Sequence, residues 1–206
     1  MSLDSRPKID SVPTYPHPFS LDRMVRAVEK VGLRLLRTVK ALESASVPYA
    51  VIGGNAVAAW VSRIDEAAVR NTQDVDILLR AEDFARAKVA LEAAGFVYRK
   101  AAGIQFFLDS PDGKFRDAVH VLLARQKVRP DYETPTPDVT DSERGEEFQV
   151  VSLQALVEMK LNSFRDKDRT HLRDMLEIGL INETWPAKFS PTLAARLLQL
   201  INDPEG

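Results

Sequence analysis

Two aspartates separated by one residue, Asp74 and Asp76, are the side chains of this sequence best suited to chemistry. In an extended strand, residues two apart point to the same side, so their carboxylates would lie about 7 Å apart on one face. Such a pair repels itself unless a positive charge lies between the two groups, and hard divalent cations such as Mg²⁺ commonly supply that charge. The pair therefore predicts a metal site.

A glycine turn precedes the two aspartates in the sequence. Gly53-Gly54-Asn55 directly follows the apolar run Tyr49–Ile52, and apolar residues at helical spacing come after it. Because glycine has no Cβ and tolerates positive φ, the backbone of such a turn can approach a ligand closely. The helix that begins there presents free N–H groups, which suit phosphate oxygens. Turn and acids together predict a site for Mg²⁺ and a phosphate-bearing ligand.

The elements that would position these residues alternate between helix and strand. Apolar periodicity predicts a long amphipathic helix from Ser20 to about Ser46, a helix after the glycine turn, and a helix over Glu82–Ala94 that ends at Gly95. Short apolar runs predict strands at Tyr49–Ile52, Val75–Leu79, Phe96–Arg99, Ile104–Leu108, Phe115–Leu123 and Phe148–Val151. We expect an α/β (α+β) fold, with a mixed central sheet flanked by helices.

The last third of the chain reads as helical. Residues 125–147 are rich in proline and acids without periodicity, which predicts a long surface loop, and Ser152 can then cap a helix. If that helix is unbroken, one stripe of it carries Lys160, Phe164, Lys167, Asp168 and His171. We therefore expect an extended arm over residues 1–19, an α/β core over residues 20–151, and a C-terminal helical part over residues 152–206 that covers the cleft.

Composition excludes several classes of protein. The chain has 206 residues and no cysteine, so thiolate metal sites and disulfides are excluded, and its formal net charge of −2 argues against a generally basic nucleic-acid binder. A local positive patch stays open. No apolar run approaches the ~20 residues that span a membrane, and the N-terminus lacks the apolar core of a secretory signal. We expect a cytoplasmic protein without a membrane partner.

The order of these motifs resembles a known fold. A strand, Gly53-Gly54-Asn55, a helix, and then Arg70-Asn71-Thr72-Gln73-Asp74-Val75-Asp76-Ile77 resemble the polymerase-β-like nucleotidyltransferase superfamily. The sequence is most similar to the minimal bacterial branch that includes AbiEii-type toxins. In that branch a later helix carries a lysine, an Arg-x-Lys-Asp run and a further Asp, which here read Lys160, Arg165-Asp166-Lys167-Asp168 and Asp174.

The resemblance implies roles for individual residues. Gly53 and Gly54 would hold the phosphates of a nucleoside triphosphate, with Asn55 beside them, and Lys160 would reach the triphosphate or the incoming substrate. Asp74 and Asp76 would bind the catalytic Mg²⁺, for which Mn²⁺ is an alternative. Arg70 and Thr72 would either contact the nucleotide or cap the preceding helix and orient Asp74.

The resemblance also implies a reaction. A nucleoside monophosphate would move from an NTP to a hydroxyl of a tRNA 3′ end, a protein side chain or a small molecule. The branch further suggests the toxin half of a toxin–antitoxin pair, with an antitoxin as partner.

One position departs from the family pattern. A third carboxylate is expected in an apolar run such as Ala118–Leu123, where this sequence has His120. His120 either belongs to the site, taking a proton or holding a transition metal, or is hydrogen-bonded within a half-buried sheet. This departure motivates a second hypothesis, a catalytically impaired nucleotidyltransferase fold that binds a nucleotide or a protein partner.

Other candidates have structural alternatives. Lys160 and Lys167 could be solvated positions paired with neighbouring acids. Trp60 and Phe164 fall on apolar helical spacings and are expected in the core. Three acids of the last third could instead join helices through salt bridges, namely Asp166, Asp168 and Asp174.

Overall fold

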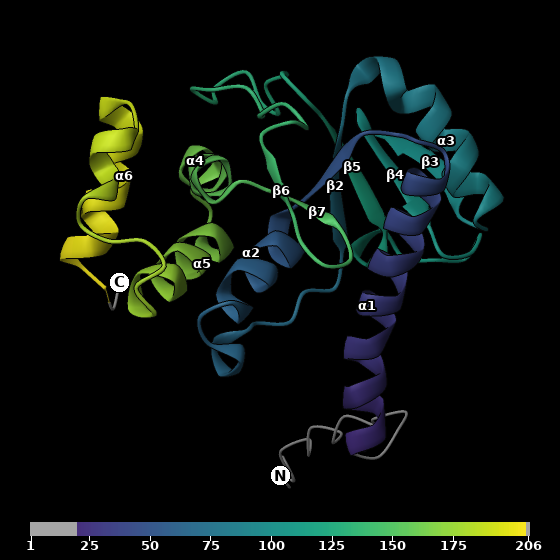
Figure 1. Cartoon of the computed structure of the whole chain (residues 1–206), viewed down its shortest axis with the longest axis horizontal. Helices are drawn as coiled ribbons and strands as arrows, with labels where there is room; N and C mark the ends of the chain where they lie inside the picture. Colours follow the sequence, from purple (N-terminus) through teal and green to yellow (C-terminus); the bar gives the residue numbers. More distant parts are fainter. Residues whose placement is uncertain (1–19, 205–206) are drawn as a thin grey trace, which may run out of the picture.

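A seven-stranded sheet forms the centre of the protein (Figure 1). The computed structural model describes residues 20–204. The strands lie in the order β3-β4-β5-β2-β1-β7-β6. Their bounds are β1 (Tyr49–Ile52), β2 (Val75–Leu79), β3 (Val97–Ala101), β4 (Ile104–Leu108), β5 (Val119–Leu123), β6 (Ser142–Arg144) and β7 (Gln149–Val151). Because β1 pairs with β7 and β2 with β5 in parallel while the other pairs are antiparallel, the predicted mixed sheet is confirmed.

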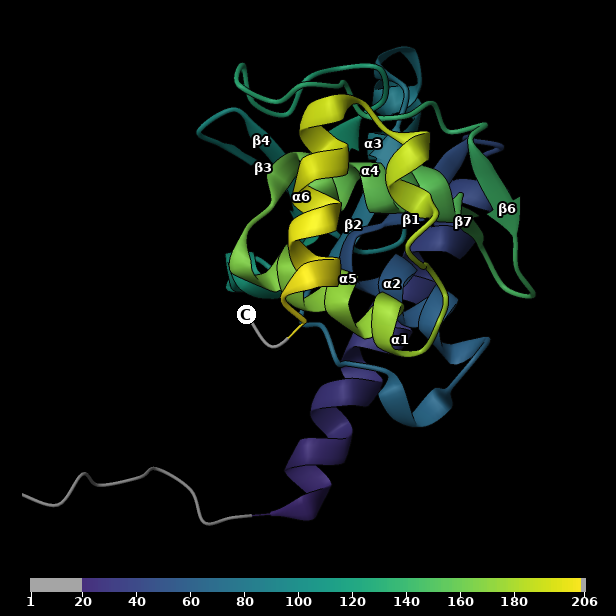
Figure 2. The same ribbon diagram turned by 90° about the vertical axis from the view of Figure 1, so that its left-hand side faces the viewer.

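Helices cover both faces of the sheet. Their bounds are α1 (Leu21–Ser44), α2 (Gly53–Ser62), α3 (Phe84–Ala93), α4 (Leu153–Ser163), α5 (Asp166–Glu177) and α6 (Pro191–Asn202). One hydrophobic core lies between the sheet and α1 and α3, and a second joins the sheet to α2, α4, α5 and α6. Figure 2 shows the last three helices in front of the strands.

The alternation of side chains along the central strands decides which face carries the site. Ala50 and Ile52 of β1 belong to the core beneath α2, whereas Val51 belongs to the core beneath α1. Leu78 of β2 also belongs to the α2 core. Since residues two apart in a strand share a face, Asp76 lies on the α2 face as well.

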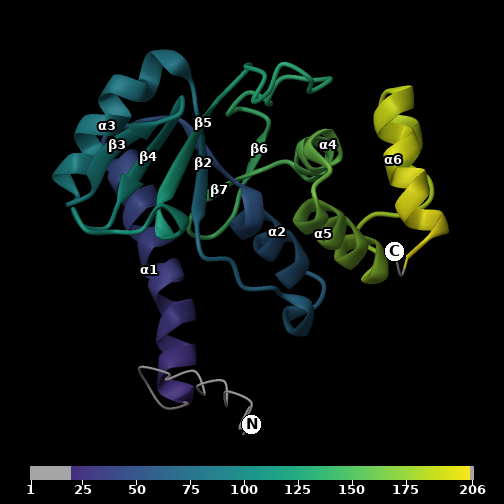
Figure 3. The ribbon, with the colours of Figure 1, turned by 180° about the vertical axis from the view of Figure 1, so that it is seen from behind.

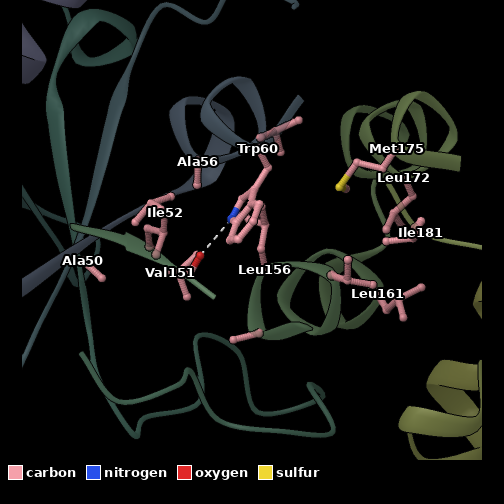
Figure 4. Close-up of a cluster of buried hydrophobic side chains, with 14 of the residues drawn as sticks. Ala50, Ile52, Ala56, Trp60, Val151, Leu156, Leu161, Leu172, Met175 and Ile181 are labelled. Atoms are coloured by element: carbon pink, nitrogen blue, oxygen red, sulfur yellow. Dashed lines mark hydrogen bonds between the residues drawn. The ribbon is translucent and has the colours of Figure 1, made fainter. Parts of the chain in front are cut away.

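A tryptophan of α2 lies in the core between the sheet and α2, α4, α5 and α6 (Figure 4). Trp60 is buried, and its indole Nε1 donates a hydrogen bond of 3.0 Å to the carbonyl oxygen of Val151. This bond ties α2 to the last residue of β7, the strand that leads into α4. The prediction that Trp60 belongs to the core is confirmed.

Two predicted elements differ in the structure. The strand expected over Phe115–Leu123 begins only at Val119, because Phe115–Asp117 forms a 3-10 turn. The loop expected over 125–147 contains the short strand β6, which pairs with β7. Gly145 N–H closes that hairpin on the Phe148 carbonyl at 2.9 Å. A strand of three polar residues leaves no apolar period to detect.

The last predicted helix is broken. Phe164 adopts a left-handed conformation with φ 46°, so α4 ends at Ser163 and α5 begins at Asp166. Asp168 stabilises the new start by accepting hydrogen bonds from the backbone and side chain of Arg165. The stripe that depended on an unbroken helix is therefore split between two helices.

The predicted division of the chain into three parts stays a prediction. The arm expected over residues 1–19 lies outside the described residues, and the boundary at residue 152 stays a prediction. Within residues 20–204, no helix combines the length and the apolar character needed to cross a membrane.

Candidate functional site

The site lies at one end of three neighbouring central strands, β1, β2 and β5. Strand pairing places Ile52 opposite Asp76, and Asp76 opposite His120. Ile52 leads directly into Gly53, the first residue of α2. Figure 3 shows β2 and β5 side by side, with α2 and α5 on the same side of them. The glycine turn, the aspartates and the histidine thus converge from separate parts of the chain.

Asp74, Asp76 and His120 form one group, here called the carboxylate–histidine cluster. One ligand atom of each lies within 4.8 Å of the others, and His120 Nδ1 lies 3.6 Å from Asp76 Oδ1. Asp74 precedes β2, which begins at Val75, yet its carboxylate still converges with that of Asp76. All three side chains are partly exposed and therefore open to a ligand.

The glycine turn touches this cluster directly. A Cβ on Gly53 would lie 2.0 Å from Asp76 Oδ2, and a Cβ on Gly54 would lie 2.7 Å from Thr72 Oγ1. Gly53 also has φ +68°, which side chains rarely adopt. The two glycines therefore make room for the acids and their support. That they also hold phosphates stays a prediction.

Asp74 is oriented by two neighbours. Thr72 Oγ1 donates a hydrogen bond of 2.6 Å to Asp74 Oδ1, and Asn55 Nδ2 donates one of 2.8 Å to the Asp74 backbone carbonyl. Burial raises the pKa of Asp74, but the Thr72 hydrogen bond and the charge of Lys167 outweigh it, so the pKa lies below its usual value. Asp74 is therefore ionised near neutral pH and able to bind a cation.

His120 faces the two acids from β5. Its Nε2 lies 2.9 Å from the Phe115 carbonyl oxygen, and its ring lies 4.6 Å from the ring of Phe115, centroid to centroid. Burial lowers the pKa of His120, but the nearby Asp76 carboxylate outweighs it and raises the pKa above its usual value. His120 therefore lies beside the acids and is also hydrogen-bonded in a half-buried position, and its part in the site stays a prediction.

The two lysines of the predicted stripe have different surroundings. Lys160 is buried, and its Nζ lies 3.0 Å from Asp168 Oδ1. Lys167 is half-exposed, and its Nζ lies 3.8 Å from Asp74 Oδ1. The break at Phe164 produces this difference, because it turns α5 away from the direction of α4. The predicted contact of Lys160 with a triphosphate stays a prediction, and Lys167 is the lysine that lies beside the acids.

Arg70 also lies in an ion pair. Its Nε and Nη2 donate to Asp174 at 2.6 and 2.9 Å, which joins the segment before β2 to α5. Sequence reasoning left Lys167 and Arg165 out of the site, although both stand in the Arg165–Asp168 run that it singled out. Arg165 bonds to Asp168 and lies close enough to Asp76 for their charges to interact.

The arrangement fits a divalent cation. Two carboxylates and an imidazole nitrogen converge within 4.8 Å of one another, and a half-buried pair of acids needs a compensating positive charge. Asp74, Asp76 and His120 are the side chains that would hold such a cation. Lys167 and Arg165 add positive charge at the rim, which suits an anionic ligand.

Comparisons with known proteins bear on the fold. No protein-family model matches the sequence, and none of the curated proteins is similar to it. An antigenic nucleotidyltransferase-like protein from Paracoccidioides brasiliensis has a similar structure, with a TM-score of 0.59 and 18% identity over 87% of this chain and 91% of that one. The structure of ANT(2″)-Ia in complex with adenylyl-2″-tobramycin gives a TM-score of 0.52 and 13% identity over 83% of this chain and 98% of that one. The chain has the fold of these nucleotidyltransferases.

Proposed function

We propose that the protein is a divalent-metal-dependent nucleotidyltransferase that moves a nucleoside monophosphate from an NTP to a hydroxyl acceptor. One observation carries the proposal. Asp74 and Asp76 converge with His120 directly against the Gly53 turn, on a sheet whose fold matches nucleotidyltransferases. An unrelated use of the fold would not require the acids, the turn and the cations of α5 at one place.

Each residue has a stated part in this proposal. The Gly53–Gly54 turn and the first N–H groups of α2 would receive phosphate oxygens. Asp74 and Asp76 would hold Mg²⁺ or Mn²⁺, with Thr72 and Asn55 fixing Asp74. The bound cation would neutralise charge that develops on the phosphate and activate the attacking hydroxyl.

The C-terminal helices complete the site. Lys167 and Arg165 of the α5 start lie beside the two acids, where they would meet the triphosphate. Residues 152–206 would then cover the cleft, as expected from the sequence. Lys160 and Arg70 would act indirectly, by positioning α5 through their ion pairs with Asp168 and Asp174.

Label transfer tests the proposal. The full chain is incubated with each α-labelled NTP, Mg²⁺ or Mn²⁺, and bulk tRNA, lysate protein or small hydroxyl compounds in turn. We expect transfer by the wild type and a loss of about 10³-fold or more in Asp74→Asn/Asp76→Asn. Asp166→Asn is the matched control, because Asp166 lies on α5 and is almost fully exposed. Equal transfer by the double variant would refute the proposed role of the acids.

A second candidate function is nucleotide binding without transfer. It is favoured by His120, since an imidazole stands where the resemblance expects the third carboxylate. The same incubation separates the two, because this candidate predicts metal-dependent NTP binding in the wild type but no labelled acceptor.

The toxin role, with an antitoxin partner, is tested separately: growth arrest on expression of the wild type but not of Asp74→Asn/Asp76→Asn supports it.

A further inference from the structure

We propose that His120 is the third metal ligand beside Asp74 and Asp76, and that its imidazole makes the centre prefer Mn²⁺ over Mg²⁺. This inference rests on the proposed function and specifies the cation that the site selects. It starts from the position of the ring. Nδ1 of His120 lies 3.6 Å from Asp76 Oδ1, and His120 offers a ring nitrogen within 4.8 Å of an oxygen of each carboxylate.

The hydrogen bond on the far side of the ring determines which nitrogen can bind a metal. Nε2 lies 2.9 Å from the carbonyl oxygen of Phe115, and a carbonyl oxygen only accepts. Nε2 therefore carries the proton, and the lone pair of the neutral ring belongs to Nδ1. Histidines that bind metals in proteins characteristically donate their other N–H to a carbonyl or carboxylate in this way.

Packing holds the ring in that orientation. The ring of Phe115 lies at a centroid distance of 4.6 Å with an angle of 31°, and the ring of Phe106 meets it edge-on at 6.3 Å. The parallel pairing of β5 with β2 places its backbone opposite Asp76. Because these two aromatic rings pack against the imidazole and Nε2 is bonded to the Phe115 carbonyl, the ring is held with Nδ1 toward the acids.

The carboxylates show matching support. Thr72 donates to one oxygen of Asp74, and its neighbour Asp76 is packed against the open backbone of Gly53. Among residues 20–204, the side chains nearest the two acids that could donate to them from a cationic group are Lys167 and His120, which lie 3.8 and 3.6 Å from the acid oxygens, beyond the length of an ordinary hydrogen bond. Oxygen lone pairs of both acids thus remain for a cation.

The donor set then decides between cations. Mg²⁺ takes oxygen ligands and keeps several waters, whereas imidazole nitrogen suits first-row transition metals. Mn²⁺ accepts both kinds of donor, because it takes carboxylate and water oxygens as Mg²⁺ does and is also a first-row transition metal that binds imidazole. Two carboxylates and one imidazole therefore match Mn²⁺ better than they match Mg²⁺.

Direct metal binding tests the inference without any nucleotide. Mn²⁺ and Mg²⁺ are titrated calorimetrically into the full chain, and the Mn²⁺-loaded protein is studied by electron spin echo spectroscopy for coupling to nitrogen. The first variant is His120→Asp, which gives the site three carboxylates. The second is His171→Gln, a control that removes a histidine of α5 outside the site. Urea unfolding of each variant confirms that it is folded.

We expect nitrogen coupling in the wild type and in His171→Gln, and its loss in His120→Asp. The ratio of Mn²⁺ to Mg²⁺ affinity should fall by about tenfold or more in His120→Asp. An uncoupled Mn²⁺ signal in the wild type, no Mn²⁺ binding, or an unchanged affinity ratio would each overturn the inference. Nitrogen coupling without label transfer leaves the inference standing while the proposed function fails, and Mg²⁺-supported transfer without nitrogen coupling does the reverse.

Discussion

Two clusters of the protein combine the same residue types, two aspartates and a histidine with a lysine beside them. The carboxylate–histidine cluster lies at one end of the central strands β2 and β5, beside Lys167. The second, here called the interhelical cluster, lies between α4 and α5 and consists of Lys160, Asp168, His171 and Asp174. Its members are between 1% and 8% exposed, whereas Asp74, Asp76 and His120 are between 14% and 25% exposed.

The larger difference is in the contacts that the acids make. In the interhelical cluster, Asp168 accepts from Lys160 at 3.0 Å, Ser163 at 2.6 Å and Arg165 at 2.9 Å. In the carboxylate–histidine cluster, His120 and Lys167 are the nearest basic side chains of the part that the structure describes, and at 3.6 and 3.8 Å they lie beyond direct hydrogen bonds. One cluster uses its charges to join helices, and the other keeps its oxygens available. Residue type alone does not distinguish a structural cluster from a reactive one.

Removing one charge from the interhelical cluster should have the largest effect on stability. Asp168→Asn leaves the Lys160 ammonium buried without its counter-charge, which typically costs about 3 to 5 kcal/mol. The free energy of unfolding, measured in urea, should fall by that amount. Asp166→Asn, two residues away and exposed, should change it by less than about 0.5 kcal/mol.

The same variant tests whether the contrast is real. If Asp168→Asn abolished label transfer while its stability stayed near that of the wild type, Asp168 and Lys160 would belong to the reactive site. The two clusters would then be one. A loss of stability, with transfer retained by the folded fraction, keeps them separate.

Acidic pH should destabilise the protein through His171, the histidine of the interhelical cluster. Burial and the charges of Lys160 and Lys167 lower the pKa of His171 to about 4 from its usual 6.5, although Asp168 and Asp174 oppose them. Between these values the unfolded chain binds a proton that the folded chain refuses, so stability falls as the pH drops through this window. The expected loss is roughly 2 to 3 kcal/mol.

Urea unfolding between pH 4 and pH 7 measures this slope, since that range brackets the two pKa values of His171. His171→Gln should flatten this dependence of the unfolding free energy on pH. His120→Gln, the matched change in the other cluster, should leave it, because the pKa of His120 is raised, so the folded and the unfolded chain both bind its proton below 6.5. The pKa of Asp168, lowered to about 2, adds a further loss only under more acidic conditions. An acid slope that vanished with His120→Gln would reverse the assignment of the two histidines.

The fold was predictable because its signals are local. Apolar runs between glycines and prolines marked the strands, and Gly95, at φ 88°, ends α3 as expected. The convergence of Asp74 and Asp76 follows from their spacing of two along one strand direction. His120 was recognised as a departure, but its place opposite Asp76 depends on the pairing of β5 with β2, which no local pattern encodes.

The choice between the two lysines was not predictable. It depends on the left-handed conformation of Phe164, and periodicity reasoning assumes that a helix continues. An aromatic residue in that conformation is uncommon, so nothing in the sequence marked the break. The ion pair of Arg70 with Asp174 spans 104 residues and is likewise invisible to local patterns.

Lys167 provides the finest test of the contrast. Lys167→Met removes a half-exposed cation beside Asp74, so the KM for NTP should rise about tenfold while kcat changes less. Lys160→Met removes a buried cation that faces Asp168, so it should lower the urea midpoint and leave the KM of the folded fraction unchanged. Initial rates at varied NTP, together with unfolding curves, measure both quantities for both variants. If KM rose in Lys160→Met and not in Lys167→Met, the triphosphate would be bound from the end of α4, and the buried ion pair would open when nucleotide enters.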